Sequence, residues 1–210
     1  NDRDGRLQYW EGQVDWQFGD RPIFTLVTKF FQGLLVGIWF NFNDFDNDGD
    51  HDLLSHTPGT DNVSYYENVN GTLQLVNSQL HTPSGFPVYG GQIVIPTVAD
   101  IDADGHLDYF VGDISGRLAY YAGQGNVDTG PQFEFVSDYF ENIQIIWTPG
   151  RHGANSISFY DLDNDSDLDL IWGDFYQPGL FYLENYGDNN DPHFVDSLMV
   201  DNFPGSGMLE

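Results

Sequence analysis

The sequence predicts an all-β fold, and three observations support this prediction. Short runs of aromatic and β-branched residues are separated by Gly, Asn, Asp and Pro, as strands are separated by turns. No stretch of helical length shows an apolar period of 3.6 residues. One acidic loop pattern occurs three times, each time with the same succession of short apolar runs after it. The chain is therefore expected to be built from repeated β units.

The acidic pattern is D-x-D-x-D-[G/S]-x-x-D, and we name its copies loop 1 (residues 44–52), loop 2 (residues 100–108) and loop 3 (residues 161–169). Acids at positions 1, 3, 5 and 9 of one short loop repel one another unless a cation lies among them. Calcium accepts six to eight oxygen ligands at roughly 2.3–2.6 Å and suits such a loop. The sequence predicts about three bound calcium ions, one in each loop.

Each loop position has an expected role. The side chains at positions 1, 3, 5 and 9 are expected to ligate the ion, together with the main-chain carbonyl of position 7. Gly49 and Gly105 at position 6 allow the positive φ that a tight turn requires. Ser166 replaces them in loop 3, so we expect backbone strain and weaker binding there. The predicted metal-binding residues are Asp44, Asp46, Asp48, Asp50 and Asp52; Asp100, Asp102, Asp104, His106 and Asp108; and Asp161, Asp163, Asp165, Asp167 and Asp169.

Two other interpretations of these loops are weaker. An EF-hand requires a Glu at position 12 and flanking helices, but position 12 is Ser55, Val111 or Trp172, and the flanking residues are strand-like. Acidic turns that bind no metal are the other alternative. Such turns rarely place four acids in one register three times. We therefore expect each loop to join two strands, with position 9 at the start of the second.

The elements that follow the loops also repeat. A short apolar run comes first, with a Gly-Asp pair after it in two copies but Ser55-His56-Thr57-Pro58 in the first. An aromatic strand is next, then a polar turn and a further strand. The loop starts are 56 and then 61 residues apart. The aromatic strands are predicted at 63–68, 117–123 and 180–185, and the last strands at 73–76, 133–136 and 194–196.

Repeats of about four short strands predict a β-propeller of four-stranded antiparallel blades, whose faces are buried only between neighbours. Residues 2–12 align with 113–123, so the chain begins and ends within a repeat. We expect about three full repeats and partial blades at both ends. A fourth blade shared by the two ends would lack the equivalent of residues 150–172, including a loop. Residues 1–210 are therefore interpreted as a single propeller region, a fragment of a larger ring.

Composition narrows the class of function. The formal charge is −27, with 33 acids against six Lys and Arg, which argues against binding to nucleic acid or to an anionic membrane. The loops hold 14 of these acids. Because cysteine is absent, disulfides, thiolate metal sites and a cysteine nucleophile are excluded. No apolar run is long enough to insert into a membrane, and the first residue is Asn1, as in a processed protein or a fragment.

No known catalytic motif stands out, so an enzyme is not expected. The candidate catalytic carboxylates outside the loops are few, namely Asp113, Asp174, Glu67 and Glu184. Asp113 and Asp174 recur at equivalent positions, which indicates a role in turns. The pair Arg151-His152, on a Gly-rich stretch, is the most site-like alternative to a plain surface turn. The repeated tyrosines could stack on sugars, but packing within blades explains them better.

The three loops, the Gly-Asp turns and the strands Tyr65-Tyr66-Glu67-Asn68 and Tyr182-Leu183-Glu184-Asn185 resemble the FG-GAP/VCBS repeat family, which includes the propeller of integrin α-subunits. The resemblance covers nearly the whole chain. It implies a secreted or cell-surface calcium-binding propeller but no single activity. The expected role is recognition, adhesion or surface assembly, with a protein or carbohydrate ligand at the cell surface or by self-association. The alternatives are an enzyme acting on polysaccharide (a lyase or glycoside hydrolase) and a structural unit of an extracellular filament or surface layer.

Overall fold

The computed structural model describes residues 4–13, 22–91, 94–113, 116–143, 156–173 and 180–194. In these ranges the regular elements are β-strands and two single-turn 3-10 helices, so the predicted all-β class is confirmed. The strands form four antiparallel sheets.

The sheet that follows the N-terminal region has four strands in the order β3-β4-β5-β6. They are β3 (Phe40–Asn43), β4 (Asp52–His56), β5 (Val63–Val69) and β6 (Thr72–Asn77). Every neighbouring pair is antiparallel, and loop 1 joins β3 to β4. The predicted strands at 63–68 and 73–76 are therefore confirmed within one or two residues.

The next sheet repeats this arrangement in the order β7-β8-β9-β10. Its strands are β7 (Thr97–Ala99), β8 (Asp108–Gly112), β9 (Leu118–Val127) and β10 (Gly130–Ser137). Loop 2 joins β7 to β8, as loop 1 joins β3 to β4. The long hairpin of β9 and β10 contains two register shifts.

Two further sheets are smaller. The third repeat forms β11 (Ser156–Tyr160), β12 (Asp169–Gly173) and β13 (Leu180–Leu183), with loop 3 between β11 and β12. An isolated bridge between Asn185 and Phe194 stands where a fourth strand was predicted. Near the N-terminus, β1 (Tyr9–Gly12) pairs with β2 (Phe24–Thr28).

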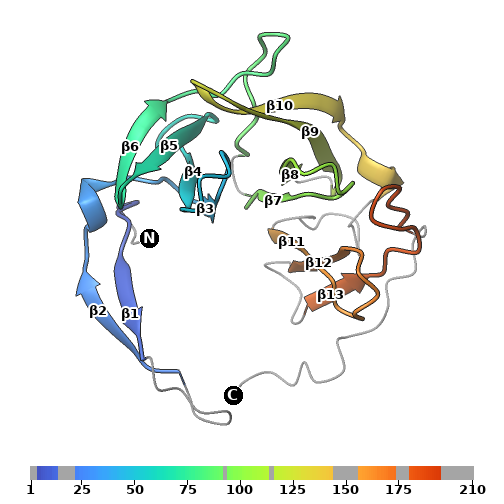
Figure 1. Ribbon diagram of the computed structural model, residues 1–210, viewed down its shortest axis with the longest axis horizontal. Coiled ribbons are helices and arrows are strands. Elements are labelled where there is room, and N and C mark those ends of the chain that lie inside the picture. Colours follow the sequence, from blue (N-terminus) through green and yellow to red (C-terminus); the bar gives the residue numbers. More distant parts are fainter. Residues whose placement is uncertain are drawn as a thin grey trace.

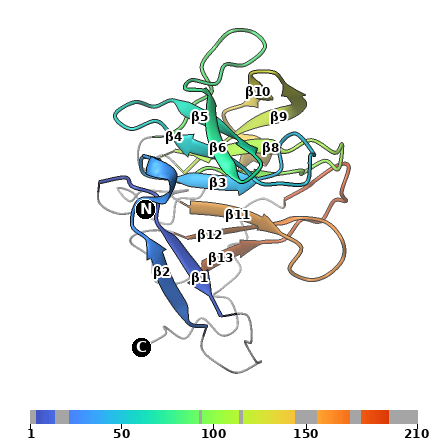
Figure 2. The same cartoon turned by 60° about the vertical axis from the view of Figure 1, so that its left-hand side comes forward.

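The sheets are arranged around a circle in a propeller-like manner (Figure 1). Strands β3, β7 and β11, which precede the three loops, lie nearest to the centre, and the later strands of each sheet lie farther out. A parallel bridge between Ile95 and Ser156 connects the segments that begin β7 and β11. Figure 2 shows the sheets from the side, with the β1–β2 hairpin projecting beside the others.

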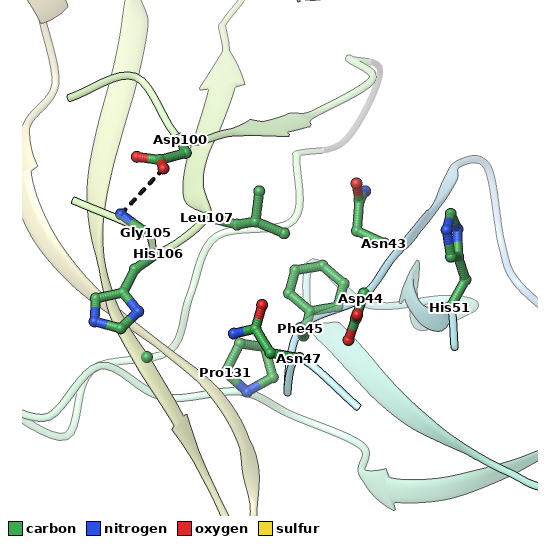
Figure 3. Close-up of a pocket in the computed structure, with 11 residues that line it drawn as sticks. Asn43, Asp44, Phe45, Asn47, His51, Asp100, Gly105, His106, Leu107 and Pro131 are labelled. Carbon is green, nitrogen blue, oxygen red and sulfur yellow. Dashed lines mark hydrogen bonds between the residues drawn. The ribbon is translucent and has the colours of Figure 1, made fainter. Parts of the chain in front are cut away.

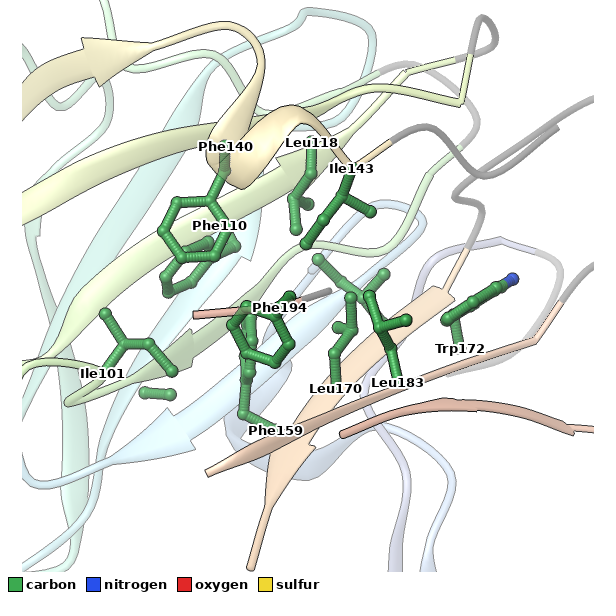
Figure 4. Close-up of a cluster of buried hydrophobic side chains, with 12 residues drawn as sticks. Ile101, Phe110, Leu118, Phe140, Ile143, Phe159, Leu170, Trp172, Leu183 and Phe194 are labelled. Carbon is green, nitrogen blue, oxygen red and sulfur yellow. The ribbon is translucent and has the colours of Figure 1, made fainter. Parts of the chain in front are cut away.

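The hydrophobic core lies between sheets, as predicted for units that bury their faces against neighbours. One cluster joins Trp39, Leu54 and Tyr65 of the first repeat to Tyr109 and Phe133 of the second. Another cluster joins the second repeat to the third, and Figure 4 shows its aromatic and aliphatic side chains. Its members include Phe110, Leu118, Phe140, Phe159, Leu170 and Phe194.

The first repeat has His56 where the second and third repeats have the glycine of their Gly-Asp pairs. His56 is the last residue of β4, as Gly112 is the last residue of β8, so this departure leaves the length of the strand unchanged. The His56 ring is buried and lies 6.3 Å from the ring of Trp39. The first repeat thus makes an aromatic contact at a position where glycine has no side chain, and a turn still follows β4.

Candidate metal centres

Each loop gathers three carboxylates at one point. The acids at positions 1, 3 and 5 each offer a ligand oxygen, and within a loop these oxygens lie within 4.8 Å of one another. They are half-buried or exposed, so a hydrated cation can approach them. The arrangement recurs in three successive repeats, always between the first two strands of a sheet. The triads are Asp44, Asp46 and Asp48; Asp100, Asp102 and Asp104; and Asp161, Asp163 and Asp165.

Main-chain N–H groups hold these carboxylates in place, as loop 2 illustrates. The Asp104 N–H donates to Asp100 Oδ1 at 3.1 Å and to Asp102 Oδ1 at 3.3 Å. The Gly105 N–H donates to Asp100 Oδ2 at 3.1 Å, and the His106 N–H donates to Asp104 Oδ1 at 2.8 Å. Loop 1 makes the same four contacts. The backbone thus fixes the orientation of the acids before any ion arrives.

Loop 3 makes three of these four contacts. Its first carboxylate keeps one buried oxygen, Asp161 Oδ1, without a hydrogen-bond partner. Ser166 adopts φ = 85°, close to the 95° of Gly49 and the 88° of Gly105. The predicted positive φ at position 6 is therefore confirmed, and the serine carries a conformation that glycine adopts freely.

The acid at position 9 differs from the triad because its side chain is almost completely buried. Asp108 Oδ2 accepts the Ile101 N–H at 3.0 Å, and Asp108 Oδ1 accepts the Gly123 N–H of β9 at 2.8 Å. Asp52 and Asp169 make the same pair of contacts in the other repeats. Position 9 thus ties the start of the loop to the third strand of its sheet, or in the third repeat to Asn185 just after that strand, a structural role that sequence reasoning missed.

A carboxylate oxygen has two lone pairs, so these hydrogen bonds leave acceptor capacity for a cation at position 9. Burial nevertheless raises the pKa of Asp108 to about 6, more than the two N–H donors lower it. In the first repeat the Tyr65 hydroxyl also donates to Asp52 Oδ2 at 2.9 Å. This contact could have been anticipated from the sequence, because tyrosine recurs in the third strand of the repeats.

Position 7 was expected to contribute only its main-chain carbonyl to the ion, but in two loops its side chain also places a carboxylate oxygen at the site. In loops 1 and 3 this residue is Asp50 or Asp167, and each has one buried carboxylate oxygen, Oδ1, without a hydrogen-bond partner. Burial and the neighbouring carboxylates, Asp165 foremost, raise the pKa of Asp167 to about 6. Buried oxygens without donors, among acids held close together, are the environment that a hard cation stabilises.

A cavity of about 310 Å³ lies between loops 1 and 2 (Figure 3). His51 and His106 are both exposed and lie on opposite sides of it. Phe45 and Leu107 contribute apolar surface. The first acid of each loop, Asp44 or Asp100, also lines the cavity, so metal binding would alter its charge.

The other described candidate residues take part in a turn or in the hydrophobic core. Asp113 Oδ1 accepts the Arg117 N–H at 3.0 Å, which confirms its turn role. Tyr65 and Tyr121 are buried in the core, as the packing interpretation predicts. The pair Arg151-His152 and Asp174 lie outside the described residues.

The fold and the loops define an all-β, propeller-like repeat protein with three carboxylate triads that could hold metal ions. The chain belongs to the FG-GAP-like repeat family, whose sequence profile matches residues 44–111 and 100–172. Each match begins at a loop and extends through the next one, so the family pattern coincides with the structural repeat. A comparison with curated proteins gives no match. Among the described residues, no helix combines the length and apolarity needed to cross a bilayer.

Proposed function

We propose that the chain is a calcium-binding region of an extracellular β-propeller that serves recognition, adhesion or surface assembly. The observation that carries this proposal is the recurrence of one preorganised carboxylate triad in three successive repeats. The ligands would be the acids at positions 1, 3, 5 and 9 with the carbonyl of position 7, and water would complete a shell of six to eight oxygens. Each complete blade would have four strands, and residues 1–210 would be part of a larger ring.

Bound calcium would neutralise charge where the loops concentrate it. Three ions, each with two positive charges, would change the formal charge from −27 to −21. The ions would bind the folded loops far better than an unfolded chain, so binding would stabilise the fold. Affinities from micromolar to about 10⁻³ M would suit an extracellular module.

The proposed role is binding and not catalysis. Asp113, a carboxylate outside the loops, is engaged by its own turn, which supports this view. The partner would be a protein or a carbohydrate at a cell surface, or a second copy of the chain. Sedimentation with and without calcium would detect self-association, and glycan arrays would detect a carbohydrate ligand.

The metal proposal is tested by calorimetric titration with calcium after treatment with EGTA. We expect about three ions per chain. Asp46→Asn, Asp102→Asn and Asp163→Asn should each abolish or greatly weaken one site. Asp138→Asn is the matched control because it removes an exposed acid outside the loops. The absence of calcium binding, or a stoichiometry that none of the three loop variants lowers, would overturn the metal assignment.

A further inference from the structure

The turn between β5 and β6 contains the one Asn-Gly pair of the sequence, Asn70-Gly71. Both residues have positive φ, 54° for Asn70 and 83° for Gly71, as a two-residue hairpin turn requires. Val69 pairs with Thr72 on either side of them, so these two residues alone make the turn. Both are exposed, and the space that a β-carbon of Gly71 would occupy is open. The bond between them is therefore accessible to water.

An asparagine in this setting can modify itself. The main-chain nitrogen of Gly71 attacks Cγ of the Asn70 side chain, and a succinimide ring closes. The side-chain amide nitrogen leaves as ammonia and takes the proton of the Gly71 N–H with it. Water then opens the ring at either of its two carbonyl groups, which leaves aspartate or isoaspartate at position 70. A side chain on the following residue would hinder the attack, and glycine has none.

The same turn is held by a side chain from another part of the chain. Gln32, in the 3-10 turn Phe31–Gly33, donates from Nε2 to the Gly71 carbonyl at 2.9 Å. Its Oε1 accepts the Leu73 N–H at 2.8 Å, so one amide group clamps both sides of the turn. Isoaspartate adds a methylene group to the main chain just before Gly71. The lengthened turn then moves the Gly71 carbonyl relative to the Leu73 N–H, and the Gln32 clamp is lost.

Other asparagines nearby in the sequence lack this combination. The side-chain amides of Asn68 and Asn77 donate to main-chain carbonyls, at 3.1 Å in each case. Asn126 is exposed, but like the other two it precedes a residue that has a side chain. These three asparagines, which also lie in strands of a hairpin, serve as reference sites for Asn70.

We propose that Asn70 is a self-modification site, and that its conversion to isoaspartate releases the Gln32 clamp on the β5–β6 hairpin. The reaction takes up water, releases ammonia and needs no enzyme, so it proceeds in the folded protein over its lifetime. Each converted molecule loses the same contact between the 3-10 turn and the hairpin. The inference goes beyond the proposed function, and it depends on neither calcium binding nor an extracellular location.

The modification is tested by incubating the folded chain in mildly alkaline buffer. Cleavage after Glu67 and Glu134 gives a peptide of residues 68–134, in which all four sites can be compared. Tandem mass spectrometry locates the conversion of each amide to an acid, and an isoaspartate methyltransferase identifies the isomer. We expect Asn70 to convert to isoaspartate and aspartate while the three reference asparagines stay intact. Conversion of Asn70 that is no faster than that of Asn126 would overturn the modification site.

Hydrogen exchange tests the release of the clamp. In the isoaspartate fraction the Leu73 amide should exchange about tenfold faster than in fresh protein, as the loss of one or two hydrogen bonds predicts. Fresh Asn70→Asp is the matched control, because it adds the charge without lengthening the main chain, and its Leu73 amide should exchange as in the parent. Fresh Gln32→Ala should exchange as fast as the isoaspartate form. The amides of β8 should stay equally protected in every sample, which verifies the fold. Unchanged exchange at Leu73 in the isoaspartate form would overturn the proposed release.

Discussion

At the scale of the residue, position 6 distinguishes loop 3 from the other two loops, whereas position 4 adopts a positive φ in all three. Ser166 adopts φ = 85°, where an L-residue pays a steric cost that glycine avoids. We predict that Ser166→Gly stabilises the protein by roughly 0.5–1 kcal/mol and tightens one calcium site. Urea denaturation and calorimetry would measure the two effects.

The reciprocal change, Gly105→Ser, is the control. Open space surrounds the position of a β-carbon at Gly105, so its effect would come from the backbone alone. It should destabilise the fold and weaken one site. If Ser166→Gly lowered stability, the serine would have a compensating role and the strain argument would be wrong.

The pH dependence of the calcium-free protein is also set by single residues. Burial raises the pKa of Asp108 to about 6, whereas an unfolded chain has an Asp pKa of about 3.9. Between pH 4 and pH 6 the folded state therefore binds more protons than the unfolded state. The stability that Asp108 contributes is fully present below about pH 4 and is lost as the pH rises through 6. We predict that melting temperatures in EGTA rise when the pH is lowered from 7 to 5.

Asp108→Asn should make that rise smaller, because the variant removes one of the titrating groups. Asp138→Asn, which changes an exposed acid, should leave it unchanged. With calcium bound the trend should reverse, since protons compete with the ion for carboxylates. A melting temperature in EGTA that falls between pH 7 and pH 5 would contradict the prediction.

Residue patterns predicted the triads but not the structural role of position 9, which accepts hydrogen bonds from the start of its loop and from a later strand. The spacing of acids in a short loop is local information, so positions 1, 3 and 5 could be assigned from the sequence. The contact of Asp108 with Gly123 joins residues 15 positions apart, and it depends on the register between β8 and β9. Such a register results from packing across the sheet, which no local pattern contains.

At the scale of the element, single-turn 3-10 helices fasten neighbouring repeats together. The turn Phe31–Gly33 presents Gln32, whose Nε2 donates to the Gly71 carbonyl at 2.9 Å. Gln32 Oε1 accepts the Leu73 N–H at 2.8 Å. The equivalent turn Phe140–Asn142 directs Glu141 to His193, at 3.5 Å. One side chain thus links each turn to the outer part of the following repeat.

We predict that Gln32→Ala destabilises the fold by about 1–2 kcal/mol, because two hydrogen bonds between repeats are lost. Gln32→Glu keeps the acceptor for Leu73 but places a carboxylate against the Gly71 carbonyl, so it should also destabilise. Lys29→Ala, an exposed change close to the turn, is the control. Urea denaturation would measure all three, and a Gln32→Ala variant as stable as the parent would show that the turn adds nothing.

Strand order was predictable from the repeat itself, since apolar runs and turn residues recur in one sequence. The extent of each strand was less so. Strand β9 continues to Val127, beyond the predicted end at residue 123, because Asn126 and Val127 pair with Pro131 and Gly130 of β10 in a long hairpin. The exposure of the β1–β2 hairpin was equally hidden, because its sequence matches that of a buried hairpin.

At the scale of the whole molecule, charge opposes compaction. The chain has 33 acids and six Lys and Arg, and its loops concentrate carboxylates within a few ångströms of one another. Self-repulsion at such a net charge destabilises a compact state. The apolar core between the sheets must outweigh that repulsion, and any cation that enters the loops reduces it.

Salt should therefore substitute in part for calcium. In 1 M NaCl the Debye length is about 3 Å, against about 30 Å at 0.01 M, so repulsion between loops and surface acids is screened. We predict that the melting temperature in EGTA rises by about 4 °C or more between these salt concentrations. The rise should be smaller in saturating calcium, because the ions have already neutralised part of the charge. A triple variant, Asp46→Asn, Asp102→Asn and Asp163→Asn, should also respond less to salt in EGTA. An equal response in calcium and in EGTA would show that the loops are not the main source of the repulsion, and that calcium stabilises by coordination alone.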